Sequence, residues 1–142
     1  MKKIYTASIT TILSLLIYSC GNNSGQSESA GAPAATAKGS GEAIYKKTCI
    51  TCHQANGEGL PNTYPPLAKS DFLVDKEKTI GQVIKGFSGE LTVNGKKYNS
   101  SMPPQQLTDD EIASVLTYVY SNFGNSGGVV TADDVKAVRT KL

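Results

Sequence analysis

The chain has 142 residues, which is enough for one domain of ordinary size and a leader or tail. Its 14 lysines and arginines nearly balance its 12 acidic residues, and Lys2 and Lys3 lie in a leader that we expect to be removed. The remaining chain is neutral and has no basic run, which argues against nucleic-acid binding. Because no apolar stretch approaches the ~18 residues of a membrane span, a polytopic membrane protein is also excluded.

Residues 1–19 have the pattern of a secretory signal peptide, with two lysines before an apolar run from Ile9 to Tyr18. Residues 17–20, Ile-Tyr-Ser-Cys, resemble the lipobox of bacterial lipoproteins, in which a diacylglycerol is attached to the cysteine. This resemblance implies that Cys20 carries lipid and holds the exported protein on a membrane in the periplasm. The alternative is that Cys20 is a chance residue beside an ordinary cleavage site. In both cases the remaining cysteines enter an oxidising compartment.

Residues 20–41 are predicted to form a flexible linker. Gly, Ser and Ala make up 14 of the 21 residues from Gly21 to Gly41, and no hydrophobic periodicity is present. A coil of about 20 such residues has a root-mean-square reach of ~25 Å. With lipid on Cys20, this linker holds a small domain close to the membrane while letting it turn; without lipid it has no evident function.

Residues 42–124 contain the periodic segments and are predicted to form the folded domain. A first helix is expected after Ser40, a suitable N-cap residue. Tyr45, Cys49 and Cys52 follow at spacings of four and three, which places them on one face of that helix.

An irregular loop and a short helix are expected next. The stretch QANGEGLPNTYPPL at residues 54–67 is too rich in Gly, Pro and Asn to form regular structure. Residues 76–87 then show apolar side chains at helical spacing, namely Ile80, Val83, Ile84 and Phe87. Residues 91–98 are predicted to form a small β-hairpin, because Asn94-Gly95 suits a type I′ turn between strand-forming residues.

The clearest predicted helix follows Thr108, which forms a capping box with Glu111. Gly124 is expected to end this helix. Residues 125–142 are predicted to be a C-terminal extension in which Thr131 starts a short, weaker helix. The apolar stripe of the capped helix comprises Ile112, Val115, Leu116 and Val119.

The predicted domain has too little apolar material for a core of its own. We expect Tyr45 to pack where the first helix crosses Leu116 and Tyr120, but a domain of about 82 residues is only marginally stable by burial alone. Small exported domains compensate with disulfides or a metal, and the only two cysteines inside this domain lie too close together to staple the fold. Another group is therefore expected to fill its centre.

Cys49, Cys52 and His53 form the motif CITCH, which has the spacing of c-type haem attachment. Two thiols three residues apart on a helix can each reach one vinyl group of a porphyrin, and the adjacent imidazole then reaches the iron. A zinc site needs four ligands, which the mature chain lacks. A thioredoxin-like dithiol lies beside a βαβ pattern, which is absent here, and a plain disulfide leaves His53 unexplained.

With this motif, residues 41–124 resemble a class I c-type cytochrome. The resemblance implies an all-α fold, with a few helices wrapped around one haem c that is bound covalently through Cys49 and Cys52, and with His53 as an axial iron ligand. It also implies that Met102, the only methionine after Met1, is the second axial ligand. The alternative is that Met102 is an ordinary apolar filler.

In class I cytochromes a proline carbonyl accepts a hydrogen bond from the ligand histidine. The spacing favours Pro65 for this role, with Pro66 next, and Leu67 would then pack on the porphyrin; an ordinary proline turn is the alternative. The hairpin before Met102 and the helix after Val130 lie outside a minimal class I domain. Cytochrome modules attached to larger bacterial redox enzymes are similar in both respects.

The resemblance implies a one-electron carrier between membrane and periplasmic redox proteins, not an enzyme, with no nucleic-acid partner and no small-molecule substrate. A haem-based sensor with a displaceable axial ligand is one alternative, and Met102 argues against it. A haem-free thiol-redox lipoprotein is another, and His53 together with Met102 argues against that one.

Overall fold

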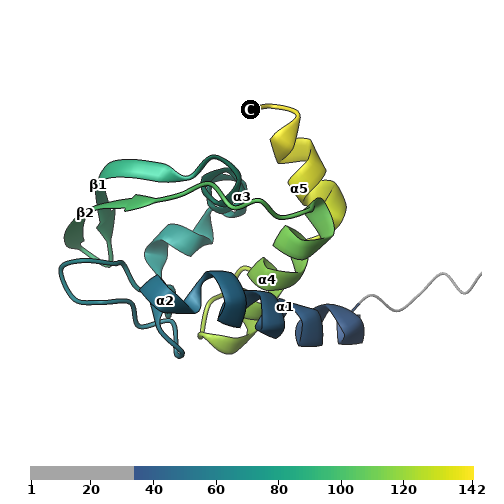
Figure 1. Cartoon of the computed structure of the whole chain (residues 1–142), viewed down its shortest axis with the longest axis horizontal. Coiled ribbons are helices and arrows are strands. Elements are labelled where there is room, and N and C mark those ends of the chain that lie inside the picture. The colour runs from purple at the N-terminus through teal and green to yellow at the C-terminus, as the bar shows by residue number, and fades with distance from the viewer. Residues whose placement is uncertain (1–33) are drawn as a thin grey trace, which may run out of the picture. The chain divides into compact units, whose positions relative to one another are not determined.

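Helices make up most of the structure, with one two-stranded hairpin among them (Figure 1). This computed structural model describes residues 34–142, with side chains from residue 41 onward; the predicted signal peptide, Cys20 and most of the linker lie outside the described residues. None of the described helices has the length and apolar character needed to cross a bilayer. The elements are α1 (Ala34–Thr48), α2 (Ile50–His53), the 3₁₀ helix η1 (Asp71–Val74), α3 (Lys76–Lys85), β1 (Phe87–Val93), β2 (Lys96–Met102), α4 (Asp109–Asn122) and α5 (Ala132–Arg139).

Helix α1 begins at Ala34, so the prediction of a start after Ser40 is wrong, and residues 34–41 are helical rather than linker. Alanine has the highest helix propensity, and three of the four residues from Ala34 are alanines. Gly41 also suits a helix here because α1 packs closely on α4. A Cβ atom at Gly41 would collide with the backbone of Ser114 on α4, so glycine permits the close crossing.

The crossing of α1 and α4 buries Tyr45, as predicted, together with Leu116 and Tyr120 in one core. The aromatic rings nearest to Tyr45 are those of Tyr118 and Phe123, at centroid distances of 5.6 and 5.1 Å. The ring of Phe123 meets that of Tyr45 edge-on, a favoured aromatic geometry. This cluster joins the first helix to the end of α4 and so positions the segment that follows α1.

The predicted capped helix is confirmed as α4. Thr108 accepts a hydrogen bond from the backbone N–H of Glu111, and the Glu111 carboxylate accepts one from the backbone N–H of Thr108. The hydrogen bonds that the carboxylate accepts from the backbone N–H and the hydroxyl of Thr108 lower the pKa of Glu111. The apolar stripe is buried, and Gly124 follows the helix with φ = 70°, a conformation that glycine adopts without strain. The buried stripe is Ile112, Val115, Leu116 and Val119.

The short helix α3 ends at Lys85, so Phe87 begins a strand and is not part of the helical stripe. Gly86 has φ = 75°, which ends the helix. The hairpin is correspondingly longer than the predicted residues 91–98, with antiparallel pairs from Phe87 and Met102 at its open end to Val93 and Lys96 at its turn. Met102 is therefore the last residue of a strand.

Residues 125–142 are part of the folded domain and not an appended extension. The predicted helix is α5, and Thr131 caps it by accepting a hydrogen bond from the backbone N–H of Asp134. Val135 and Val138 are buried in the same core as α4. The Nε atom of Arg139 also lies 2.8 Å from a carboxylate oxygen of Asp109 at the start of α4. Helix α5 therefore packs against α3 and α4 and covers the core there.

Candidate functional site

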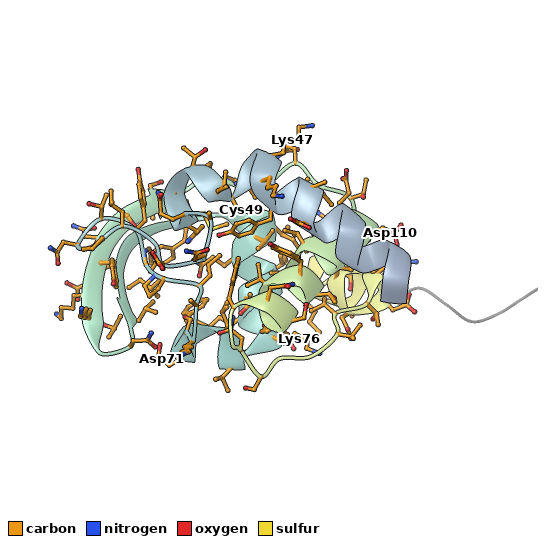
Figure 2. All side chains as sticks on the ribbon, turned by 90° about the horizontal axis from the view of Figure 1, so that it is seen from below. Lys47, Cys49, Asp71, Lys76 and Asp110 are labelled. Atoms are coloured by element: carbon orange, nitrogen blue, oxygen red, sulfur yellow. The ribbon has the colours of Figure 1, made fainter. Side chains whose placement is uncertain are left out.

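The cysteines and the histidine lie where α1 gives way to α2. Cys49 stands at the break between the two helices, and Figure 2 labels it there. Both Cys49 and Cys52 are half-buried free thiols, which excludes a disulfide between them in this structure. Burial raises the pKa of the Cys49 thiol, although a hydrogen bond with Thr48 opposes the rise. The segment is held in place because the Tyr45 hydroxyl donates to the carbonyl of Gln54, at 2.6 Å.

The ring of His53 is oriented by a backbone carbonyl. Its Nδ1 atom lies 3.0 Å from the carbonyl oxygen of Pro65. Because a carbonyl only accepts hydrogen bonds, Nδ1 carries the proton and Nε2 keeps its lone pair for a metal. Burial lowers the pKa of His53, which also favours the neutral ring. The contact lies at Pro65 and not at Pro66, and the role of Pro65 beside a haem stays a prediction.

The loop between α2 and Pro65 folds back on itself to bring that carbonyl to the histidine. The carbonyl of Gly57 accepts hydrogen bonds from the backbone N–H groups of Leu67 and Ala68, at 2.7 and 2.8 Å. Gly59 has φ = 68°, and a Cβ atom there would lie 2.7 Å from the Pro65 carbonyl oxygen. Glycine thus permits the close approach on which the His53 hydrogen bond depends.

A cavity lies against His53, and a second space shares part of its lining. The first is lined largely by apolar side chains from the loop, η1, α3, the hairpin and α4, among them Leu67. An apolar cleft with a few polar groups is the usual form of a cofactor site. The residues that line both spaces are Cys49, His53, Pro65, Gln82, Leu91, Met102 and Gln105.

Met102 and His53, which are 49 residues apart in the sequence, line the same two spaces. Met102 reaches them from the end of β2, and His53 from the end of α2. Cys49 lines both spaces and Cys52 lines the second. The structure therefore brings together every predicted site residue that it describes.

The sequence analysis missed the contribution of the hairpin and of α3 to the cavity walls. Leu91 and Val93 from β1 and Gln82 from α3 line the cavity, yet none was assigned to the site. The apolar residues at alternate positions of the strand, Leu91 and Val93, were the available signal, because alternation places them on one face. No sequence pattern marked Gln82.

The residues present fit a haem. Two thiols on one short segment suit the two thioether bonds, and the free Nε2 of His53 and the thioether of Met102 are nitrogen and sulfur donors of the kinds that ligate c-type haem iron. The apolar walls suit the porphyrin ring. This donor set and these walls together define a haem-binding site.

Comparison with known proteins agrees with this site. A sequence model of the family described as "Cytochrome c" matches residues 39–122. The chain is 37% identical over 118 residues to cytochrome c-552 of Thermus thermophilus, covering 75% of this chain and 79% of the relative. It is 33% identical over 106 residues to the fructose dehydrogenase cytochrome subunit of Gluconobacter japonicus, covering 70% of this chain but 22% of that subunit.

The chain therefore belongs to the cytochrome c family. It is a monohaem class I c-type cytochrome that carries one covalently bound haem c, and its part is electron transfer rather than catalysis. The predicted fold is correct as a mostly helical cytochrome c domain with a small hairpin.

Proposed function

We propose that this cytochrome is a one-electron carrier in which His53 and Met102 are the axial ligands of a haem held by Cys49 and Cys52. The observation that carries the proposal is that His53 and Met102 line one apolar cavity with Cys49. The haem, when bound, supplies an iron that alternates between Fe(II) and Fe(III). The protein surrounds this group with largely apolar side chains.

His53 and Met102 both influence the reduction potential of the haem that they ligate in this proposal. The Pro65 carbonyl fixes the orientation of His53 and makes its ring more basic, because Nδ1 donates to that oxygen at 3.0 Å. The soft thioether of Met102 favours Fe(II) and so raises the reduction potential. With both axial positions filled by protein, the site has no open position for a substrate, which favours a carrier over a sensor.

A haem-free thiol-redox protein fits the site less well. A reactive cysteine is a thiolate at neutral pH, which requires a lowered pKa. Burial has the opposite effect on Cys49 and raises the pKa of its thiol.

Redox proteins are the proposed partners. Among the relatives are the fructose dehydrogenase subunit and the cytochrome c subunit of a quinone alcohol dehydrogenase of Gluconobacter oxydans, 30% identical over 104 residues, which cover 70% of this chain and 22% of that subunit. These names support an exchange of electrons with dehydrogenases or with other exported redox proteins. We place the protein in the periplasm, anchored to a membrane through lipid on Cys20.

A redox titration of the purified protein tests the carrier function. We expect one reversible one-electron transition per chain, followed by the absorbance of the haem, with the same curve on oxidation and on reduction. A carrier returns to its starting state because neither ligand leaves the iron. Hysteresis between the two directions, or a transition of more than one electron, would contradict a simple carrier.

The lipid anchor is tested by Cys20→Ser. We expect the wild-type protein in the membrane fraction and the variant in the soluble periplasmic fraction, with equal haem content in both. The matched control is Ser19→Ala, which leaves the thiol in place and should stay with the membrane. If the variant also remains with the membrane, Cys20 is not the anchor.

A further inference from the structure

The turn of the hairpin is tied to η1 by two reciprocal hydrogen bonds. The side-chain Oδ1 of Asn94 accepts from the backbone N–H of Asp71 at 3.0 Å, and Oδ1 of Asp71 accepts from the backbone N–H of Asn94 at 2.8 Å. The two residues are 23 positions apart in the chain, and Figure 2 shows Asp71 close to the turn of the hairpin. Two bonds between the same two residues restrain both the position and the orientation of the turn.

The opposite end of the hairpin is fixed to the end of α3. A Cβ atom at Gly86 would lie 2.7 Å from the backbone nitrogen of Pro104, just after the end of β2, so the two segments approach closely. The backbone N–H of Gln105 also donates to the carbonyl of Val83, at 3.0 Å. These contacts lie just outside β1 and β2, so they form a hinge about which both strands, Met102 included, can tilt.

Between these two ends the hairpin forms a wall of the cavity and little else. Leu91 and Val93 line the cavity, Val93 and Tyr98 are buried, and the hairpin has no extensive backbone contact with any of the described helices. On the other side of the Asp71–Asn94 pair, Phe72 and Leu73 of η1 line the same cavity. The pair thus joins two walls of the cavity at the end far from the base of the hairpin.

The attachment of the turn to η1 affects the iron through Met102. It is the last residue of β2 and pairs with Phe87, the first residue of β1, so its side-chain direction follows the plane of the hairpin. If the turn lifts, the hairpin rotates about its base, and the Met102 side chain turns with it. The same movement withdraws Leu91 and Val93 and opens the cavity to small molecules.

We propose that Asp71 and Asn94 are positioning residues, which hold the hairpin against the cavity and thereby keep the Met102 thioether on the iron. This inference rests on the proposed ligation by Met102. Neither residue touches the cofactor site directly, since neither lines the two spaces against His53.

The test uses the full-length haem protein and two variants that each remove one side chain of the pair. Asp71→Ala removes the acceptor for the Asn94 N–H group. Asn94→Gly removes the acceptor for the Asp71 N–H group, and glycine keeps the φ of 50° that the turn requires. The conservative variants Asp71→Asn and Asn94→Asp retain an Oδ1 acceptor.

The matched control is Glu90→Gln on the same hairpin. Glu90 pairs with Lys97 at 2.9 Å, but both residues belong to the hairpin and both are exposed. Losing this ion pair leaves the attachment of the turn to η1 unchanged.

The measurement is the rate at which the reduced protein binds carbon monoxide, together with the weak sulfur-to-iron(III) absorption band of the oxidised protein. We expect Asp71→Ala and Asn94→Gly each to bind carbon monoxide about fivefold faster than wild type, the factor that follows from losing one hydrogen bond of ordinary net strength. The conservative variants and Glu90→Gln should stay within about twofold of wild type. Amide hydrogen exchange should become faster in residues 96–102 and stay unchanged in α4.

Two results would overturn the inference, and they are distinguishable. If wild type binds carbon monoxide slowly and both variants bind it equally slowly, with hydrogen exchange in the hairpin unchanged, the pair does not position Met102, and the proposed ligation stands. If wild type itself binds carbon monoxide rapidly and lacks the sulfur-to-iron(III) band, Met102 is not the ligand. The proposed function then fails together with the inference.

Discussion

Replacing both Cys49 and Cys52 with Ala should leave the full-length protein without haem and largely unfolded. The apolar cavity lies among the residues of the core, and α4 supplies part of its wall. Without the porphyrin these walls lose their packing contacts on one side, which destabilises a small domain whose own apolar core is marginal. The bound porphyrin therefore acts as part of the core.

Haem staining of a denaturing gel and far-ultraviolet circular dichroism measure the two effects separately. Wild type should keep its haem on the gel, because the thioether bonds survive denaturation, and the double variant should lose both haem and helical signal. Thr51→Ala is the matched control, since Thr51 lies between the two cysteines with its side chain exposed. A double variant that lacks haem but melts at the wild-type temperature would show that the core does not need the porphyrin.

Replacing Met102 with Ala should lower the reduction potential and let the reduced protein bind carbon monoxide. The loss of a soft thioether destabilises Fe(II), and the position that it leaves on the iron becomes open. We expect the reduction potential to fall by roughly 0.1 V or more. Axial ligands change the potential of haem over a range of about 0.8 V, so this is a modest part of that range. The sulfur-to-iron(III) band should disappear. Potentiometric titration and mixing with carbon monoxide measure these changes.

The variant Met102→His separates the two consequences of losing the thioether. Imidazole closes the sixth position again, so carbon monoxide binding should return toward the low wild-type rate while the potential remains low. Pro103→Ala alters the neighbouring residue only and should leave both properties near the wild-type values. A Met102→Ala protein with an unchanged potential would exclude Met102 as an axial ligand and revive the sensor interpretation.

Features encoded within a few residues could be predicted from the sequence. The capping box of Thr108 and Glu111 depends on a short spacing and is present in the structure. The helix expected to run through Cys49 and Cys52 instead breaks at Cys49, between α1 and α2. The spacing only ranked Pro65 above Pro66, and the structure has the His53 contact at Pro65. The close approach of Gly59 to the Pro65 carbonyl accompanies that contact.

Features that depend on distant contacts could not be predicted in full. Gly89 and Ser100 are poor strand formers, yet they pair with each other because the ladder continues to Phe87 and Met102 at the open end of the hairpin. The close crossing of α1 and α4 at Gly41 joins residues far apart in the sequence, so no local pattern shows it. The sequence spaces Val135 and Val138 as on one face of a helix. It does not show which distant residues form the core that these side chains join.

The reduced-minus-oxidised absorption spectrum of the exported, purified full-length protein tests the central claim most directly. We predict the sharp visible bands of a low-spin, six-coordinate haem in the reduced state, at one haem per chain, with no spectral change when carbon monoxide is added. The haem should remain with the polypeptide when acidified acetone is used to extract it. A protein without haem, a haem that the acetone removes, or a reduced protein that readily binds carbon monoxide would contradict a covalent haem with His53 and Met102 as its ligands.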